Sequence, residues 1–455
     1  MSVFNICEYG AVGDGSTNDA ASIQKAVDAC AKAGGGQVLL PSGKIYYSGS
    51  IVLKSHINFH VERGACLKAS GQIADYIIPE RPDKDSDRRS CGGRPNYAFI
   101  YAKGAHDLSI TGFGSIDGNA PAFAGETTQY HITGLTFSRP AMVFFEDCRH
   151  ITVTEITLKN SHFWTLHPAG CDDVLISNIR ILNDLRMANS DGIDSDHCRN
   201  VRITGCHIET ADDCIVLKNT KDLESYGPTE NVVISGCTLV STSAAIKIGT
   251  ESVSDFRNII VDSCAISRSN RGLSIQLRDG GNVENVRYSN ITVETRRFQE
   301  NWWGTGEPIY VTAFDRNKNT RSGKVKNIYF HNISCSGENG AYISGTEDNL
   351  LEEIVLDNVR LEIHKWTKWP GGVHDRRPCA DDEIVYQENA GIFCAHTKNV
   401  TLRSIKVVWG ENPPNYYGSA IEAKNVSELQ IDDFKGKGAH SNKKDILING
   451  LHRSN

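Results

Sequence analysis

Residues 200–206 read NVRITGC, and the same seven-residue pattern recurs along the chain. Apolar residues occupy its second, fourth and seventh places, and Gly or Asn often fills its sixth. The other copies are DLSITGF (107–113), HITVTEI (150–156), DVLISNI (173–179), NVVISGC (231–237), NIIVDSC (258–264), NVRYSNI (285–291), NIYFHNI (327–333), EIVLDNV (353–359), NVTLRSI (399–405), ELQIDDF (428–434) and DILINGL (445–451). This alternation predicts strands with one buried face, each followed by a turn.

The spacing of the copies predicts the fold class. Steps of 23, 27, 31, 27 and 27 residues separate the copies that begin between residues 150 and 285. A step of about 25 residues without an intervening helix is typical of a parallel β-helix coil and not of a βαβ unit. We therefore expect an all-β chain, a single parallel β-helix domain over residues 1–455, with coils over residues 56–455.

Residues 1–55 read as a cap on this solenoid. Ile23, Ala26, Val27 and Cys30 recur at helical spacing across residues 18–32, and GGG at 34–36 ends the helix. A single helix before a β-rich repeat array is expected to cover the open end of the array.

Many of the 14 cysteines follow the repeat. Cys206, Cys237 and Cys264 take the seventh place, whereas Cys148, Cys171 and Cys198 each stand two residues before a copy. Equal register in a solenoid means stacking, so we expect interior ladders of small side chains. No CxxC or CxxH spacing suggests zinc.

Composition excludes some partners. The net charge of −7 and pI near 6.1 argue against nucleic acid. The sequence contains no run of 18 or more apolar residues, so it predicts no membrane-spanning helix. The start, MSVFNICEYGAVGDG, lacks the features of an export signal, so we expect a cytoplasmic protein, or a secreted one if the sequence is trimmed. The oligomeric state is not predicted.

Three longer steps predict loops on the rim of the coils. They fall near residues 70–100, 295–320 and 363–390. Long loops on a rigid scaffold commonly shape a binding site.

The register also brings carboxylates together. Aligning NSDGID, TADDCI, TSAAIK and SNRGLS puts Asp191, Asp213, Ala244 and Arg271 in one column, with Asp212 beside Asp213. Coils lie about 4.8 Å apart, so Asp191 and Asp213 should be neighbours. Asp212 is displaced by one residue, so its side chain either diverges or is turned by a bend. Clustered carboxylates repel one another, and proteins keep them mainly for acid–base chemistry or cation binding. The alternative is that these residues only form turns.

At these residues the chain resembles glycoside hydrolase family 28, the polygalacturonase family of the pectate-lyase-type β-helix superfamily. The family's N-T-D-G-x-D motif matches NSDGID (189–194), and its D-D-C motif matches DDC (212–214). Residues 8–30 resemble the family's N-terminal cap, SHFWTLHPAGC (161–171) a further coil, and WWGTGEP (302–308) a segment of bacterial members.

The resemblance implies a right-handed β-helix and a hydrolase of glycosidic bonds. It implies that Asp212 is the general acid, and that Asp191 and Asp213 activate the attacking water. No cofactor or metal is expected.

Two departures concern the substrate. The family's G-H-G motif should fall at Ser243–Ala245 and its R-I-K motif at Ser274–Gln276, so the histidine and both basic residues are absent. These bases are thought to hold a uronate carboxylate through charge-assisted hydrogen bonds. Either Arg271, Arg278 or Lys247 replaces them, or the sugar there is neutral, as a rhamnose would be.

Eight further residues are predicted substrate contacts, each with a structural alternative. They are Asn189, Lys218, Arg271, Gln276, Trp302, Trp303, Glu307 and His162. Exposed aromatic rings stack on sugar faces, although Trp is also a common core residue.

The leading hypothesis is an inverting, exo-acting hydrolase of pectin-derived α-linked oligosaccharides, of galacturonate or rhamnogalacturonan type. The alternatives are a pectate-lyase-like β-eliminase with calcium on the acidic cluster, and a non-catalytic carbohydrate-binding β-helix.

Overall fold

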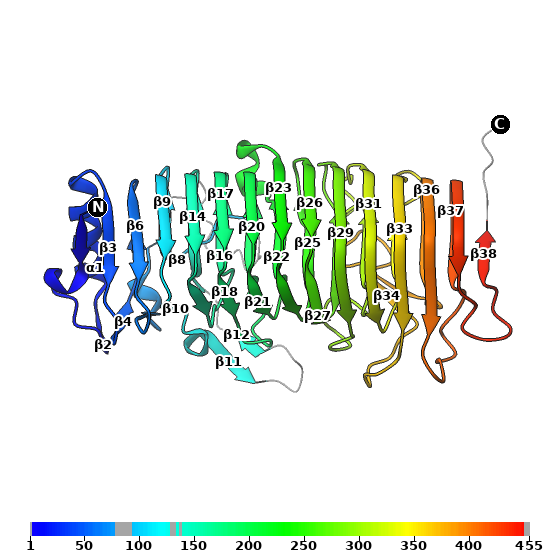
Figure 1. Cartoon of the computed structure of the whole chain (residues 1–455), viewed down its shortest axis with the longest axis horizontal. Helices are drawn as coiled ribbons and strands as arrows, with labels where there is room; N and C mark the ends of the chain where they lie inside the picture. Colours follow the sequence, from blue (N-terminus) through cyan, green and yellow to red (C-terminus); the bar gives the residue numbers. More distant parts are fainter. Residues whose placement is uncertain (1, 78–92, 128–132, 136–138, 450–455) are drawn as a thin grey trace. The chain divides into compact units, whose positions relative to one another are not determined.

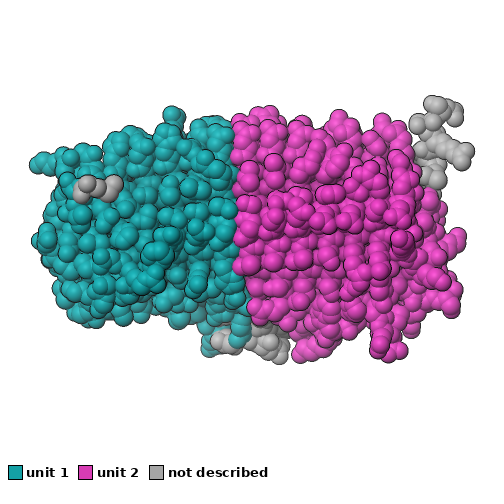
Figure 2. All heavy atoms as spheres, viewed as in Figure 1, with its two compact units in different colours: residues 1–215, 220–227 teal, residues 216–219, 228–455 magenta. Residues whose placement is uncertain are grey.

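The computed structural model describes residues 2–77, 93–127, 133–135 and 139–449. These residues form two compact units, shown in different colours in Figure 2. Unit 1 comprises Met1–Ile215 and Thr220–Gly227, and unit 2 comprises Val216–Asn219 and Pro228–Asn455. Each unit is described by itself, and the expectation of a single domain stays a prediction.

Unit 1 contains one α-helix, four 3-10 helices and the first strands among its described residues. The helices are α1 Ala20–Lys32, η1 Ile6–Tyr9, η2 Ile73–Asp75, η3 Ala120–Phe123 and η4 Lys221–Tyr226. The strands are β1 Val3–Asn5, β2 Asp14–Asn18, β3 Gly36–Leu40, β4 Ile45–Ser48, β5 Ile51–Val52, β6 Ile57–Val61, β7 Cys66–Ala69, β8 Ala98–Lys103, β9 His106–Thr111, β10 Ser115–Asp117, β11 Ala124–Thr127, β12 Thr133–Leu135, β13 Ala141–Glu146, β14 Arg149–Thr154, β15 Thr157–Lys159, β16 Leu166–Ala169, β17 Asp172–Ser177, β18 Arg180–Leu182, β19 Ile193–Asp196, β20 Arg199–Thr204 and β21 His207–Thr210.

Unit 2 contains strands alone among its described elements, and the boundary with unit 1 falls inside β22 Ile215–Asn219. The others are β23 Thr229–Ser235, β24 Thr238–Ser241, β25 Ala244–Ser252, β26 Phe256–Asp262, β27 Ala265–Ser269, β28 Arg271–Leu277, β29 Val283–Thr295, β30 Ile309–Ala313, β31 Val325–Gly337, β32 Ala341–Ser344, β33 Leu351–Ile363, β34 Val373–Asp375, β35 Ile384–Tyr386, β36 Ile392–Trp409, β37 Ile421–Lys435 and β38 Ile446–Asn449.

The repeat copies between residues 107 and 434 lie on strands that pair in parallel with the next copy, as predicted. The strand of the last copy, β38, pairs instead with Ile421–Lys424, which precede the copy at 428–434. In unit 1 the fourth-place residues Ile110, Val153, Ile176 and Ile203 are aligned across β9, β14, β17 and β20, and all are buried. In-register stacking of one buried face gives each coil the same apolar core. The prediction of a parallel β-helix is confirmed for this unit.

The same stacking runs through unit 2, where β29, β31, β33, β36 and β37 lie side by side (Figure 1). The aligned fourth-place residues are Ile234, Val261, Tyr288, Phe330, Leu356, Leu402 and Ile431. All but the half-buried Ile431 belong to the core. Tyr288 and Phe330 stack with ring centroids 4.8 Å apart.

The corners of the coils explain the polar residues of the repeat. The sixth place turns the chain with positive φ, as predicted, for example at Gly205 (φ 65°) and Asn290 (φ 56°). The first place does so too, at Asn231 (φ 58°) and Asn258 (φ 59°), which the sequence analysis missed. Asn tolerates this left-handed region, and the Asn258 amide nitrogen donates to Asn231 Oδ1 at 3.1 Å, so the corners form a hydrogen-bonded ladder.

Helix α1 confirms the predicted cap helix and begins two residues later than expected. Its buried face consists of Ile23, Ala26, Val27 and Cys30, as predicted. The Asp19 carboxylate does not cap the helix, because it accepts from the backbone N–H groups of Val12 (2.7 Å) and Gly13 (3.0 Å). No helix in the described ranges is long and apolar enough to cross a membrane.

The cysteine ladders are confirmed. The thiols of Cys148 and Cys198 contact Cys171 on either side, and all three side chains are buried. Burial and these neighbouring thiols hold the pKa of Cys171 well above its usual value. Every cysteine among the described residues is a free thiol.

The loops leave the coils where predicted, with one addition. The loop near 363–390 contains an antiparallel hairpin in which β34 pairs with β35. Most of the loop near 70–100, residues 78–92, lies outside the described residues. A further excursion, with η3 and the antiparallel pair β11–β12, was not predicted.

Candidate active site

Three aspartates meet in unit 1, as the register predicts. Asp191 precedes β19, and Asp212 and Asp213 follow β21. One carboxylate oxygen from each lies within 4.8 Å of the others. The exposed fractions are only 2%, 6% and 1% for Asp191, Asp212 and Asp213. Of the two alternatives for Asp212, the side chain does not diverge, because its carboxylate stays within the cluster.

The backbone of neighbouring coils fixes this arrangement. The Gly192 N–H donates to the Asp213 carbonyl and the Ile193 N–H to the Cys214 carbonyl, both at 2.9 Å. A Cβ atom on Gly192 would lie 2.4 Å from the Cys214 carbonyl oxygen. The glycine of NSDGID is therefore required by the close approach of two coils.

The turn that carries Asp212 is held on both sides. The Thr210 hydroxyl donates to the Asp212 carbonyl at 2.6 Å, and the Asp213 N–H donates to Asp212 Oδ1 at 3.1 Å. These bonds fix the backbone around both carboxylates and restrict the Asp212 rotamer, which pre-organises the cluster.

Arg139 is a site residue that the sequence analysis missed. Its guanidinium donates to the carbonyls of His162 and Ala188, both at 2.7 Å, and to Asn189 Oδ1 at 2.9 Å. It thereby holds two predicted substrate contacts, Asn189 and His162. No sequence signal marks Arg139, since it belongs to no repeat copy or motif.

His162 is fully buried and packs edge-on against Phe123, with ring centroids 4.5 Å apart. Burial first, and then the charge of Arg139, lowers the pKa of His162 to about 3. Its ring is therefore neutral near pH 7 and cannot act as a proton donor there. Its contact with sugar stays a prediction.

Lys218, in unit 2, is engaged in a buried ion pair. Its Nζ lies 3.1 Å from Glu251 Oε2, and the residue is 4% exposed. Burial alone would raise the pKa of Glu251, but the charges of Lys218, Arg316 and Lys247 lower it to about 2. Lys218 would have to leave this partner to bind sugar, and that role also stays a prediction.

The pairing of β25 with β28 confirms the predicted column at Ala244 and Arg271, whereas the places of the two family motifs stay a prediction. Ala244 is opposite Arg271, and Gly249 is opposite Gln276. The Gln276 amide donates to the Ser274 hydroxyl at 2.9 Å, and both are buried. The two places at which the resemblance predicts basic residues are thus occupied by a neutral, mutually bonded pair.

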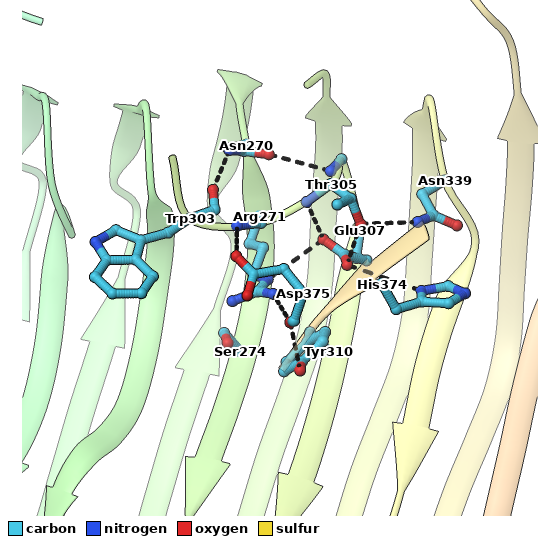
Figure 3. Close-up of polar contacts among 12 residues, drawn as sticks. Asn270, Arg271, Ser274, Trp303, Thr305, Glu307, Tyr310, Asn339, His374 and Asp375 are labelled. Carbon is cyan, nitrogen blue, oxygen red and sulfur yellow. Dashed lines mark hydrogen bonds and ion pairs between the residues drawn. The ribbon is translucent and has the colours of Figure 1, made fainter. Parts of the chain in front are cut away.

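Arg271 and Glu307 form a buried ion pair in unit 2 (Figure 3). Arg271 Nε lies 3.3 Å from Glu307 Oε2, and the guanidinium lies over the Tyr310 ring at 3.9 Å. The Thr305 hydroxyl and N–H donate to the Glu307 carboxylate at 2.5 and 2.9 Å. Both charged side chains meet protein rather than solvent, so a sugar contact by either would require this pair to open and stays a prediction.

The two tryptophans of the WWGTGEP segment are half-buried, with ring centroids 5.7 Å apart. The Arg377 guanidinium lies 5.0 Å from the centre of the Trp303 ring, and the Trp303 carbonyl accepts from the Asn270 amide (Figure 3). Trp302 lines a pocket of unit 2. Sugar contacts by Trp302 and Trp303 stay predictions.

Two described clusters have the ligand atoms a cation needs. The three aspartates offer oxygen atoms, whereas His56, His106 and Asp107 form an exposed group in unit 1. Calcium takes about 6–8 oxygen ligands, which carboxylates and waters can supply together. The aspartate cluster is therefore compatible both with acid–base chemistry and with cation binding.

The chain belongs to the glycosyl hydrolases family 28, whose sequence model matches residues 85–374. A model described as rhamnogalacturonase A/epimerase, pectate lyase-like, matches residues 3–75. The protein is therefore an enzyme that acts on O-glycosidic bonds, as the motifs predicted.

Similar proteins agree with this assignment. A probable polygalacturonase of Vitis vinifera is 32% identical over 376 residues, which is 79% of this chain and 74% of the relative. The family 28 exopolygalacturonase of Yersinia enterocolitica has a TM-score of 0.68 at 18% identity, covering 96% of this chain and 79% of that one. The Thermotoga maritima exopolygalacturonase has a TM-score of 0.66 at 22% identity, covering 80% and 87%. These structures share the right-handed β-helix.

Proposed function

We propose that the chain is an inverting, exo-acting hydrolase of α-linked oligosaccharides derived from pectin. The observation that carries the proposal is the cluster of Asp191, Asp212 and Asp213, with oxygens within 4.8 Å of one another, in a family 28 chain. Asp212 protonates the leaving oxygen, and Asp191 and Asp213 activate water.

The number of carboxylates supports this division of roles. A glycosidase needs one carboxyl group as the acid and a second one beside the sugar, and the cluster supplies three. Inverting glycosidases generally have carboxyl groups about 6.5–9.5 Å apart, and retaining ones about 5–5.5 Å. The 4.8 Å between oxygens is shorter than the expected inverting separation, so inversion rests on the family resemblance and not on distance.

Exo action is supported by the similarity to two exopolygalacturonases. An endo-polygalacturonase of Pectobacterium carotovorum is also similar, at 22% identity. The size of the products distinguishes the two modes. Release of single sugars or dimers from long chains supports exo action, whereas random internal cuts would contradict it.

Ser274 and Gln276, a neutral hydrogen-bonded pair, stand where the resemblance leads us to expect basic residues. This supports a substrate other than plain homogalacturonan. Lys247, on β25, pairs with Ser274 and is a remaining cation of these two strands. A rhamnogalacturonan-type fragment, with a neutral sugar where the family carries its basic residues, fits this chemistry best.

The test is a product analysis of wild type and Asp212→Asn. Oligogalacturonides, rhamnogalacturonan fragments and neutral α-linked oligosaccharides are incubated with each, and the new anomer is followed by NMR. We expect fresh β-anomer from an α-linked substrate with wild type and none with the variant.

Other products would identify the alternatives. Unsaturated products whose formation EDTA abolishes would show calcium-dependent β-elimination. Binding without turnover across all substrates would show a non-catalytic carbohydrate-binding protein.

A further inference from the structure

Unit 2 contains a pocket apart from the aspartate residues of unit 1. It lies between residues 297–305 and the β34–β35 hairpin and has a volume of about 160 Å³. The residues that matter chemically are Arg297, Glu300, Trp302, Asp375, Arg377 and Tyr386. The family model ends at residue 374, so strand β35 lies beyond the residues that it matches.

The pocket wall is fastened through Asp375 (Figure 3). Its carboxylate accepts from the Gly304 N–H at 2.8 Å and from Arg377 Nε at 2.9 Å, and its carbonyl accepts from the Tyr310 hydroxyl at 2.9 Å. These bonds tie the hairpin to the 297–305 segment. Asp375 also neutralises Arg377. The wall is therefore formed before a ligand arrives, which lowers the entropic cost of binding.

Arg297 supplies a positive charge that interacts with the charges of Glu307, Glu300 and Asp375 but forms no ion pair with them. It is 6% exposed, and its guanidinium donates to two carbonyl oxygens, those of Pro370 and Glu300. Among the described residues, its Nε has no hydrogen-bond partner and no carboxylate lies within ion-pair distance of it. Burial lowers the pKa of Arg297, although Glu307 and Glu300 oppose this shift. A buried cation with only carbonyl partners favours an anionic ligand.

Tyr386 supplies an aromatic face. It lies on β35 opposite Val373 and is 82% exposed, far more than is usual for so large a ring. Trp302 lines the same pocket. Aromatic faces beside charged and hydrogen-bonding groups are the combination that sugar rings use.

The size of the pocket selects the ligand further. Pockets for drug-sized ligands have about 300–1,000 Å³, so 160 Å³ accommodates one ring. We propose that this pocket binds one acidic sugar ring, a hexuronate, with its carboxylate on Arg297 and its ring on Tyr386. The choice of a pectic uronate rests on the proposed function, whereas the pocket itself does not.

The experiment titrates galacturonate into the full chain carrying Asp212→Asn, by calorimetry. Galactose, which lacks the carboxylate, is titrated in parallel. Arg297→Gln removes the charge, Tyr386→Ala the ring, and Tyr386→Trp retains an aromatic face. Tyr329→Ala is the matched control, because Tyr329 is an exposed tyrosine (37%) on β31 of the same unit. Circular dichroism verifies that each variant is folded.

We expect one galacturonate site to be weakened at least 10-fold by Arg297→Gln and by Tyr386→Ala. Tyr386→Trp and Tyr329→Ala should retain it, and galactose should bind at least 10-fold more weakly than galacturonate. Equal galacturonate binding in folded Tyr386→Ala, or equal binding of galactose, would overturn the proposal. The exposed Tyr386 keeps the test valid even if Arg297→Gln does not fold. Because binding is measured without turnover, its failure is distinguishable from a failure of the proposed hydrolysis.

Discussion

Two of the charged clusters among the described residues, Asp191–Asp213 and Arg271–Glu307, occupy the same kind of place in the coils and differ in their electrostatics. In unit 1, Asp191 and Asp213 take matching positions on neighbouring coils, which brings like charges together. In unit 2, Arg271 and Glu307 follow one another in the same way and form an ion pair. A repeat that needed only stability would resemble unit 2 in both places, since gathered carboxylates oppose folding. The difference agrees with the proposal that the chemistry takes place at the aspartates of unit 1, and we expect the Arg271–Glu307 pair to contribute to stability.

The largest expected effect is on activity. Asp212→Asn should lower kcat by about 10²–10⁴-fold, because a positioned general acid contributes that much. The free energy of unfolding should change little, because asparagine has nearly the shape of a protonated aspartate and is likewise neutral. Steady-state kinetics and urea unfolding measure both quantities. Asp184→Asn, at an exposed carboxylate of the same unit, is the control. If Asp212→Asn retains activity within 10-fold of wild type, Asp212 is not the general acid.

Breaking the Arg271–Glu307 ion pair of unit 2 should lower the stability of the fold. Arg271→Met leaves Glu307 buried and unpaired, which should lower the free energy of unfolding by about 3–5 kcal/mol. Adding Glu307→Leu should recover most of this loss. Lys326→Met, which breaks an exposed pair with Glu353 (3.5 Å), should cost under about 1 kcal/mol. An equal cost for both single variants in urea unfolding would contradict the assignment of a structural role.

Gly192→Ala should lower both the stability of the fold and the activity. Its Cβ would lie 2.4 Å from the Cys214 carbonyl oxygen, so the neighbouring coils must separate. Overpacking of this kind costs about 1–3 kcal/mol, and the shift of Asp191 against Asp213 should also lower kcat. Gly280→Ala is the control, because its nearest atom would lie 3.9 Å away. Unchanged stability and activity in Gly192→Ala would show that the close approach is not required.

A smaller effect is the pH dependence of the free energy of unfolding, which a buried histidine in each unit, His162 and His374, can test. The pKa of His162 is lowered to about 3 and that of His374 to about 4, in both cases chiefly by burial. An unfolded histidine binds a proton near pH 6.5, so the unfolded state gains protons first and stability falls as the pH drops from about 6.5 toward 4. Between pH 7 and 5 each histidine should account for about 2 kcal/mol of this loss.

Urea unfolding at pH 7 and pH 5 tests this prediction. His162→Phe and His374→Phe should each reduce the difference in unfolding free energy between the two pH values. The exposed His150 is the control, because its replacement should leave that difference nearly unchanged. The same difference in wild type and both buried-site variants would contradict the prediction.

The sequence by itself determined the coils, the cap and the gathering of the aspartates. Alternating apolar residues dictate strands locally, and a nearly constant step carries equal positions into contact, so Cys171 lies on Cys148 and Asp213 near Asp191. The positive-φ first place of the repeat was equally readable from its Asn and Asp residues, and only the turn at the sixth place was recognised.

Only the tertiary structure decided which charges are paired and where a second pocket forms. Arg271 meets Glu307 and the Asp375 carbonyl, and Arg139 meets Asn189, from positions 36, 104 and 50 residues apart. Arg271 and Glu307 take matching places on neighbouring coils, but the loop between them lengthens the step to 36 residues. Asp375, Arg139 and Asn189 lie on loops or at loop ends, outside the seven-residue repeat. Their partners are set by how each loop folds back on its coil, which local sequence patterns do not encode.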